Sequence, residues 1–329
     1  MHNYIIVHSL IKEVFYFMKK KVINNKYKID NYKVIGKSFY KKRLIDDALK
    51  FYKKAYESPL GKNDTELILD MALIYDEKGE DIKAAEKYKE ILNIDEKDER
   101  AYYGLAIIHD NREEYSEAIK YYNKAIEINP KYNRAFFFLA GAYDAIGQKE
   151  EAIKCYKEVL KMDSNDFWAN LNLGSIYEEL GQNNLAIDMF NRSLNIDPYH
   201  YLALFNMAVV MNKVGKIEDA IKYYNLSIKE NLNYPYSYLN LAVIYVEKND
   251  YNKALSIISD GILHNEDADF LYYNRACYNI HLDKLEDAID DLFKAVELYP
   301  GFIKYIKEDE ELDPIKGFKE YKEIIKESH

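Results

Sequence analysis

The sequence predicts an all-α protein, a right-handed α-solenoid of about eight helix-turn-helix repeats with a capping helix at each end. An alanine recurs every 34 residues from Ala84 to Ala288. Each interval holds two amphipathic helical runs joined by a short polar turn. Because one helix pair cannot bury its own apolar stripe, neighbouring pairs must stack on each other.

The expected boundaries follow from this period, with a first unit two residues longer than the others. The eight repeats are expected at residues 29–64, 65–98, 99–132, 133–166, 167–200, 201–234, 235–268 and 269–302. Residues 1–28 and 303–329 are then expected to cap the two ends of the stack, since terminal repeats need a polar outer face.

Each unit alternates small and large residues in a way that favours close helix packing. Counting from the first residue of a unit, positions 8 and 20 are small, whereas positions 4, 11 and 24 are mostly large. Position 15 is a turn residue, usually Gly, Asn or Asp, which tolerate the left-handed backbone that ends a helix. Arg43 and Glu113 occupy this position in two units, so those two turns are expected to be longer or differently shaped.

The pattern resembles the tetratricopeptide repeat family, whose consensus has a large residue at position 4, small residues at 8 and 20, an aromatic residue at 24 and proline at 32. The proline survives at Pro130, Pro198 and Pro300. Position 24 is aromatic in six units: Tyr52, Tyr88, Tyr122, Tyr156, Phe190 and Tyr224. The resemblance covers about residues 29–302 and implies that the first helix of each repeat lines a concave groove, through positions near 2, 5, 6, 9, 12 and 13.

At position 6 the last four repeats carry one residue type, asparagine: Asn172, Asn206, Asn240 and Asn274. An asparagine amide both donates and accepts, so a row of them can pair with the backbone of a peptide whatever its sequence. Successive first helices about 10 Å apart would match roughly three residues of extended chain. A similar row holds peptides in the tetratricopeptide region of O-linked N-acetylglucosamine transferases. Asparagine is also frequent at this position in the family at large.

Position 12 carries a second row, of carboxylates, in repeats two to five: Asp76, Asp110, Asp144 and Glu178. These side chains either attract a Lys- or Arg-rich partner or are simply solvated. Large apolar candidates lie between the rows at positions 2 and 5: Tyr103, Phe137, Trp168, Phe205, Tyr236 and Tyr273, with Leu69, Leu171, Leu239 and Phe270. An exposed run of such residues is typical of a binding surface, although some can be buried between neighbouring helices.

Composition excludes several other classes of function. The net charge is −10, with residues 1–60 at +9 and the remainder at −19, which argues against nucleic acid as a partner. There is no phosphate-binding loop, no H-E-x-x-H and no C-x-x-C, and the seven histidines show no ligand spacing, so we expect no enzyme activity, metal, cofactor or small-molecule substrate. Two cysteines without a disulfide framework favour the cytoplasm.

The amino-terminal segment leaves alternatives open. Residues 4–18 are apolar but contain Lys12 and Glu13, and three lysines follow. This stretch is too short and too charged to span a bilayer, and it lacks the order of a secretory signal. A helix capping the first repeat is preferred, and a helix at an anionic membrane surface is the rival.

Together these features predict a non-enzymatic, cytoplasmic scaffold that binds an extended peptide or partner segment in its groove. The alternatives are an accessory or targeting subunit of an enzyme or membrane-associated complex, and a receptor for a signalling peptide. The sequence does not indicate the partner or the oligomeric state.

Overall fold

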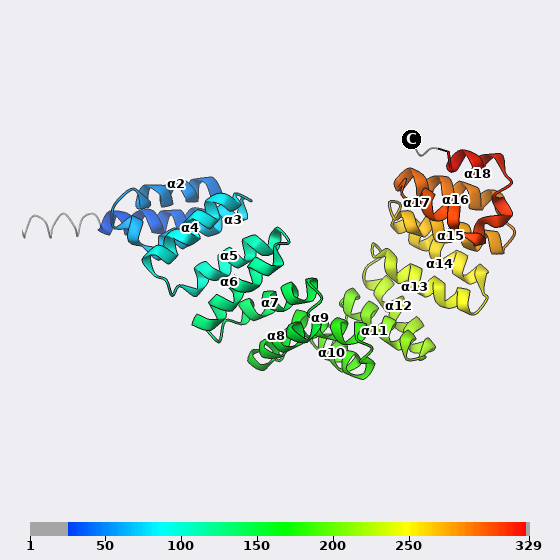
Figure 1. Cartoon of the computed structure of the whole chain (residues 1–329), viewed down its shortest axis with the longest axis horizontal. Helices are drawn as coiled ribbons and strands as arrows, with labels where there is room; N and C mark the ends of the chain where they lie inside the picture. Colours follow the sequence, from blue (N-terminus) through cyan, green and yellow to red (C-terminus); the bar gives the residue numbers. More distant parts are fainter. Residues whose placement is uncertain (1–25, 327–329) are drawn as a thin grey trace, which may run out of the picture. The chain divides into compact units, whose positions relative to one another are not determined.

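The computed structural model describes residues 26–326, and every regular element within that range is helical (Figure 1). The chain divides into two compact units, with the boundary in the sequence between Met162 and Asp163, and each unit is described by itself. In the described range no helix is long and apolar enough to cross a membrane. The expected roles of the amino-terminal segment concern mainly residues 1–25, which lie outside the described residues.

In the first unit a helix over residues 26–41 precedes a series of helix pairs. The elements are α2 (Ile45–Tyr56), η1 (Gly61–Asn63), α3 (Thr65–Glu77), α4 (Asp81–Ile94), α5 (Glu99–Asn111), α6 (Tyr115–Ile128), α7 (Asn133–Ala145) and α8 (Lys149–Met162).

The second unit continues the same alternation and ends in shorter helices. Its elements are α9 (Phe167–Glu179), α10 (Asn183–Ile196), α11 (Tyr201–Lys213), α12 (Ile217–Glu230), α13 (Pro235–Glu247), α14 (Tyr251–His264), α15 (Asp269–His281), α16 (Leu285–Leu298), α17 (Phe302–Glu308), η2 (Glu310–Ile315) and α18 (Lys319–Ile324). The first helices α3, α5, α7, α9, α11, α13 and α15 begin at the residues where the 34-residue period starts a unit.

The turn inside each pair has one geometry throughout, which corrects the expectation for two of them. Arg43 and Glu113 adopt the left-handed backbone, with φ of 61° and 59°, as Gly79 and Gly147 do at φ of 68° and 76°. The closing hydrogen bond is also the same, for example from the Glu114 amide to the His109 carbonyl at 2.9 Å. Packing of the helix pair therefore determines the conformation of the turn, and the residue type at position 15 changes only the free-energy cost of that conformation.

The core of each unit comes from the alternation of small and large residues. The alanines at position 20 are fully buried, and the aromatic rings at position 24 pack beside them. Gly104 and Gly174 show how close this packing is, since a Cβ atom on either would lie within 2.5 Å of the ring of Tyr88 or Phe190. Such dense packing aligns the first helices on one side of each unit.

The carboxy-terminal helices continue the core of the last repeat. Ile303 and Ile306 of α17 are buried with Leu312 and Ile315 of η2 against α15 and α16. Tyr321 of α18 donates a 2.9 Å hydrogen bond to the carbonyl oxygen of Ile306. This segment therefore covers the end of the second unit. The division of the chain into repeats and caps at the expected residues stays a prediction.

Candidate functional site

We define the first-helix face of a unit as the side chains at positions 2, 5, 6, 9, 12 and 13 of its first helices. In the second unit this face carries the asparagine row, at the middle of α9, α11, α13 and α15. All four asparagines are half-buried, neither packed into the core nor turned fully outward. The row thus lies at the surface between neighbouring first helices.

Local hydrogen bonds hold these amides in place. Asn240 and Asn274 donate from Nδ2 to the carbonyl oxygen one turn earlier, at 2.8 and 2.7 Å. Asn206 donates to Ser175 Oγ on α9 at 3.1 Å, which ties α11 to its neighbour. Within residues 26–326 no protein group donates to the Oδ1 atoms of these three. Each therefore keeps its acceptor and one amide hydrogen for another molecule.

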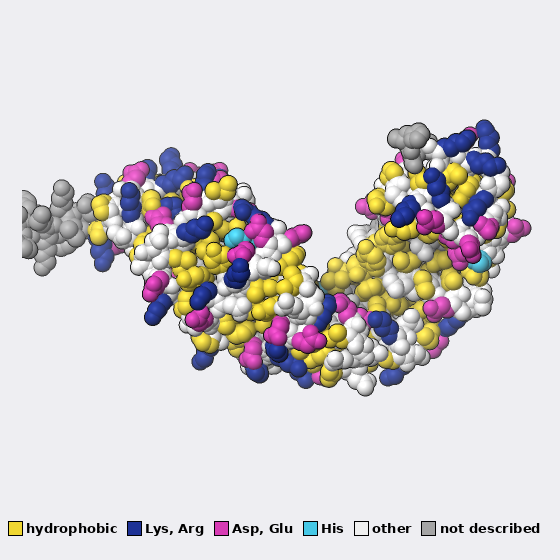
Figure 2. All heavy atoms as spheres, in the orientation of Figure 1, with side chains coloured by type: hydrophobic (Ala, Val, Ile, Leu, Met, Phe, Trp, Pro, Cys, Tyr) yellow, Lys and Arg dark blue, Asp and Glu magenta, His cyan; other side chains and the backbone are white. Residues whose placement is uncertain are grey.

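A strip of aromatic rings runs along the amino-terminal ends of the same helices. Trp168 and Tyr236 are 48% and 49% exposed. The rings between neighbouring helices form a chain of contacts at centroid distances of 4.4 to 5.5 Å, through Phe167, His200, Tyr201, Tyr234 and Phe270. We call these seven residues the aromatic strip. Figure 2 shows hydrophobic side chains gathered over α13 and the helices beside it.

The remaining apolar candidates of this unit are less accessible. Phe205 packs edge-on against Tyr234 at 5.1 Å, and Tyr273 stacks on Phe302 at 5.2 Å and donates its hydroxyl to Asp309. Both are half-buried. Leu171 is only 3% exposed, so it is one of the candidates that are buried and does not line the face.

The first unit presents a different face, with a cavity of about 470 Å³ between α3, α5 and α7. Tyr103 lies in its wall, 5.1 Å from the ring of Tyr132 and 5.7 Å from the guanidinium of Arg134. Burial raises the pKa of Tyr132 to about 12, so its hydroxyl stays protonated at neutral pH. Phe137 instead packs edge-on against Tyr156 at 5.6 Å and does not line the cavity.

Sequence reasoning missed most residues of this cavity, among them Arg100, Arg134 and Phe138. They occupy positions 2 and 6, which had already been assigned to the groove, so the same frame could have found them. Arg100 is engaged by Asp98 and by Glu66 at 2.6 and 2.5 Å. Arg134 has no carboxylate partner within residues 26–326.

The carboxylate row is largely compensated inside the protein. Tyr122 donates to Asp110 Oδ2 at 2.7 Å, Lys149 Nζ lies 2.7 Å from Asp144, and Lys213 pairs with Glu178. Burial raises the pKa of Asp110, and the Tyr122 hydroxyl opposes that shift. Burial, with Asp81 nearby, also raises the pKa of Asp76. Three of the four carboxylates therefore have a structural partner.

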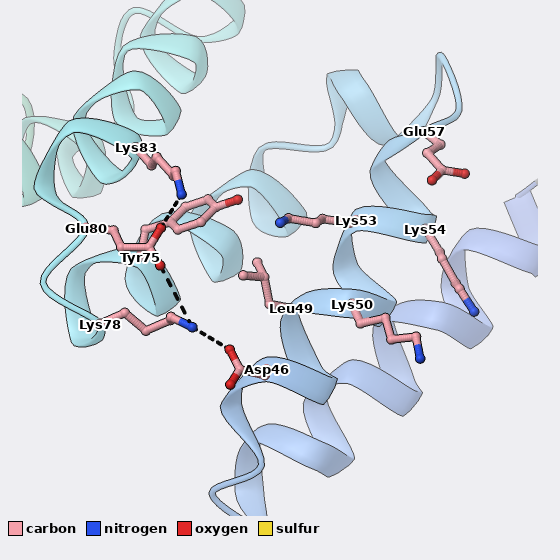
Figure 3. Close-up of a pocket in the computed structure, with 10 residues that line it drawn as sticks. All are labelled: Asp46, Leu49, Lys50, Lys53, Lys54, Glu57, Tyr75, Lys78, Glu80 and Lys83. Atoms are coloured by element: carbon pink, nitrogen blue, oxygen red, sulfur yellow. Dashed lines mark hydrogen bonds and ion pairs between the residues drawn. The ribbon is translucent and has the colours of Figure 1, made fainter.

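A basic cavity lies on another side of the first unit, among α2, α3 and α4 (Figure 3). Its volume is about 450 Å³, and five lysines line it: Lys50, Lys53, Lys54, Lys78 and Lys83. Lys78 pairs with Asp46, and Lys83 lies 2.5 Å from Glu80. Lys50, Lys53 and Lys54 of α2 make no ion pair within residues 26–326, which leaves this cavity positive.

Comparison with models of protein families identifies the repeated helix pairs. Tetratricopeptide repeat models match residues 99–132, 169–200 and 235–262, and a TPR repeat model matches residues 142–181. A search of curated proteins found no match.

Solved structures with a similar fold share little sequence with this chain. A tetratricopeptide repeat protein from Parabacteroides merdae is 19% identical, with a TM-score of 0.59 over 80% of this chain and 97% of its own. PilF of Pseudomonas aeruginosa is 19% identical, with a TM-score of 0.53 over 64% and 97%. YrrB, a TPR protein described as having an unusual peptide-binding site, is 22% identical, with a TM-score of 0.50 over 56% and 95%.

At these identities the structural likeness shows the fold, and the family models add the repeat signature. The chain is a tetratricopeptide repeat protein, built as an α-solenoid of the kind that generally serves as a scaffold for protein interactions.

Proposed function

We propose that this chain is a non-enzymatic, cytoplasmic scaffold that binds an extended peptide segment along the first-helix face of residues 163–326. The observation that carries the proposal is the free Oδ1 acceptor on Asn206, Asn240 and Asn274, on the same helices as the aromatic strip. A peptide-binding site is also described for YrrB, which has a similar fold.

The asparagines would bind the peptide backbone, and the aromatic strip would bind its side chains. A free Oδ1 accepts from a peptide N–H, and the remaining amide hydrogen donates to a peptide carbonyl. Trp168 and Tyr236 offer large, half-exposed rings for apolar side chains. We therefore propose a segment that is extended and carries apolar residues.

The carboxylate row contributes less to this proposal. Because Asp110, Asp144 and Glu178 have partners in the protein, a Lys- or Arg-rich segment would have to compete with them. Exposed ion pairs of this kind contribute about 0–1 kcal/mol each. We propose basic residues in the partner only as a secondary preference.

The test selects peptides from a random displayed library on the immobilised full chain, then measures their affinity for variants. Replacing Asn206 and Asn240 by Ala removes two hydrogen-bonding sites worth about 0.5–1.5 kcal/mol each, so we expect roughly 5- to 150-fold weaker binding. Asn225→Ala is the matched control, since its Nδ2 also donates to the carbonyl one turn earlier but lies on the second helix α12.

Trp168 supplies an independent readout because it is the only tryptophan in the chain. A peptide that covers its half-exposed indole should shift the fluorescence emission to shorter wavelength. Selected peptides that bind the Asn206→Ala, Asn240→Ala variant as tightly as the parent, with unchanged Trp168 emission, would show that this face is not the binding site.

A targeting role is the second candidate, favoured by the basic cavity of the first unit. Its lysines would attract an anionic lipid surface or an acidic partner. Flotation with vesicles containing phosphatidylserine tests the lipid source, with Lys50, Lys53 and Lys54 replaced by Gln as the comparison. Parent chain that stays unbound at low salt would remove this candidate.

A further inference from the structure

Three potential metal ligands meet where the last repeat joins the carboxy-terminal segment, and a histidine lies beside one of them. Cys277 and His281 lie on α15, and Asp309 and Glu311 lie where α17 passes into η2. The ligand atoms of Cys277, Asp309 and Glu311 all lie within 4.8 Å of one another. The Nε2 atom of His281 is 3.7 Å from Glu311 Oε1. We call these four residues the Cys-His-carboxylate cluster.

The fold explains why these groups converge. Cys277 and His281 are four residues apart on one helix, so both point to the same side of it. They occupy positions 9 and 13, where the next repeat would supply neighbours. Here the chain turns back instead, and η2 lies against α15. Residues about 30 positions later in the chain thereby reach the two α15 side chains.

Neighbouring groups orient the potential ligands. Tyr273 donates its hydroxyl to Asp309 Oδ2, while Asp309 Oδ1 accepts from the Glu311 amide at 2.9 Å. The His281 ring stacks on Tyr251 at a centroid distance of 4.2 Å. Hydrogen-bonded carboxylates and fixed imidazole rings of this kind are typical around protein metal sites.

The charge balance of the cluster also favours a cation. Cys277 is only 6% exposed and lies beside two carboxylates. A divalent cation would compensate the carboxylates and take a thiolate as a ligand, since metal binding displaces the thiol proton.

We propose that the Cys-His-carboxylate cluster binds a transition-metal ion of the zinc class and thereby fastens the carboxy-terminal segment to the last repeat. The mixture of one sulfur, one imidazole and two carboxylate donors suits Zn²⁺, whereas Ca²⁺ and Mg²⁺ prefer oxygen alone. Bonds of about 2.0–2.3 Å place tetrahedral ligand atoms about 3.3–3.8 Å apart. To complete such a site, the exposed Glu311 side chain must rotate towards Cys277 and Asp309, and the His281 ring must tilt away from Tyr251. This site is independent of the asparagine row.

The experiment uses the metal-free full chain and Co²⁺ as a spectroscopic substitute for Zn²⁺. We expect one equivalent of Co²⁺ to give a thiolate-to-cobalt charge-transfer band, which Zn²⁺ then displaces. Cys277→Ser should abolish the band and weaken Zn²⁺ binding at least about 10-fold. Cys155→Ser is the matched control, since it removes the other buried cysteine, on α8.

A second variant guards against a folding defect in Cys277→Ser. Replacing Asp309 by Asn and Glu311 by Gln keeps the thiol and the hydrogen-bonding shape, and should also weaken Zn²⁺ binding at least about 10-fold. Co²⁺ binding without a thiolate band, or Zn²⁺ affinity unchanged in this double variant, would overturn the proposal, as would no binding by the parent chain.

Discussion

The two units have the same pattern of core residues but differ in the residues on the first-helix face. In residues 163–326 position 6 is asparagine four times, whereas Val34, Asp70, Gly104 and Phe138 occupy it in residues 26–162. The alanines at position 20 are fully buried in both units. The second unit presents a repeated polar row beside aromatic rings, and the first presents the cavity beside Tyr103. The same helix pair thus tolerates different linings.

The physical reason is that the core positions and position 6 of the first-helix face have different neighbours. Positions 8, 20 and 24 pack between helices, where a change in volume disturbs close-packed atoms. Position 6 lies at the surface in the second unit and makes mainly local hydrogen bonds. Recognition chemistry can therefore change from unit to unit without a change of fold.

The largest expected effect concerns the ion pair between Arg275 and the buried carboxylate of Asp291. Arg275 binds Asp291 through two nitrogens at 2.6 to 3.1 Å, and Asn279 donates to the same carboxylate. Arg275→Met leaves Asp291 buried without its cation, which should cost about 3 kcal/mol in the free energy of unfolding. Arg192→Met, which breaks an exposed pair with Asp188, should cost no more than about 0.5 kcal/mol.

The loss of stability caused by Arg275→Met should depend on pH. Burial raises the pKa of Asp291, and Arg275 opposes that shift. In the Arg275→Met variant the pKa of Asp291 is therefore higher still. A carboxyl with a raised folded-state pKa contributes stability below its unfolded pKa of about 4 and loses it as the pH rises through the folded value. Urea unfolding followed by circular dichroism should therefore show a smaller deficit near pH 4 than at pH 7. An equal deficit at both values would contradict this account.

A smaller effect is expected when the residue of one unit is transferred to the other. Gly104→Asn places the second unit's residue in the first, but a Cβ there would lie 2.2 Å from Tyr88 Cζ. We expect a loss of about 1–3 kcal/mol by urea unfolding, as in overpacked cores. The reverse change, Asn240→Gly, should cost only about 0.5–1 kcal/mol, the helix penalty of glycine. Equal costs would mean that position 6 is equivalent in the two units.

The smallest expected change in the free energy of unfolding concerns the turns inside the helix pairs. Glu113 in the first unit holds φ of 59° and Asn249 in the second holds φ of 57°. Glu113→Gly should stabilise by up to about 1 kcal/mol, because a left-handed backbone is costly for glutamate. Asn249→Gly should gain less, since asparagine tolerates this region. Gly147→Ala, in the same geometry, should destabilise; a stabilising result there would contradict the argument.

Much of the scaffold could be predicted from the 34-residue period. The alanines and aromatic residues indicated the helix pairs, and position 15 indicated the left-handed turns. The expectation for Arg43 and Glu113 was wrong because residue preference is a weak local effect, whereas packing of the helix pair acts on every repeat. The asparagine row could be predicted directly from the sequence, because a fixed period places the same position of every repeat on the same face.

The candidate sites depended on contacts between residues about 30 positions apart. Which carboxylates are free follows from partners such as Lys213 for Glu178, in the next repeat. The cavity beside Tyr103 requires α3, α5 and α7 together. No metal site is expected from the sequence, because Asp309 and Glu311 reach Cys277 and His281 only through the turn after α17.

Periodicity alone was enough to establish the repeated helix pair and the residues that its core requires, because each pair meets the same neighbours at every step. Tertiary structure decided which of the remaining side chains are available to another molecule. That property depends on hydrogen bonds, ion pairs and ring contacts between helices, some within a repeat and others, such as Lys213 with Glu178, between neighbouring repeats.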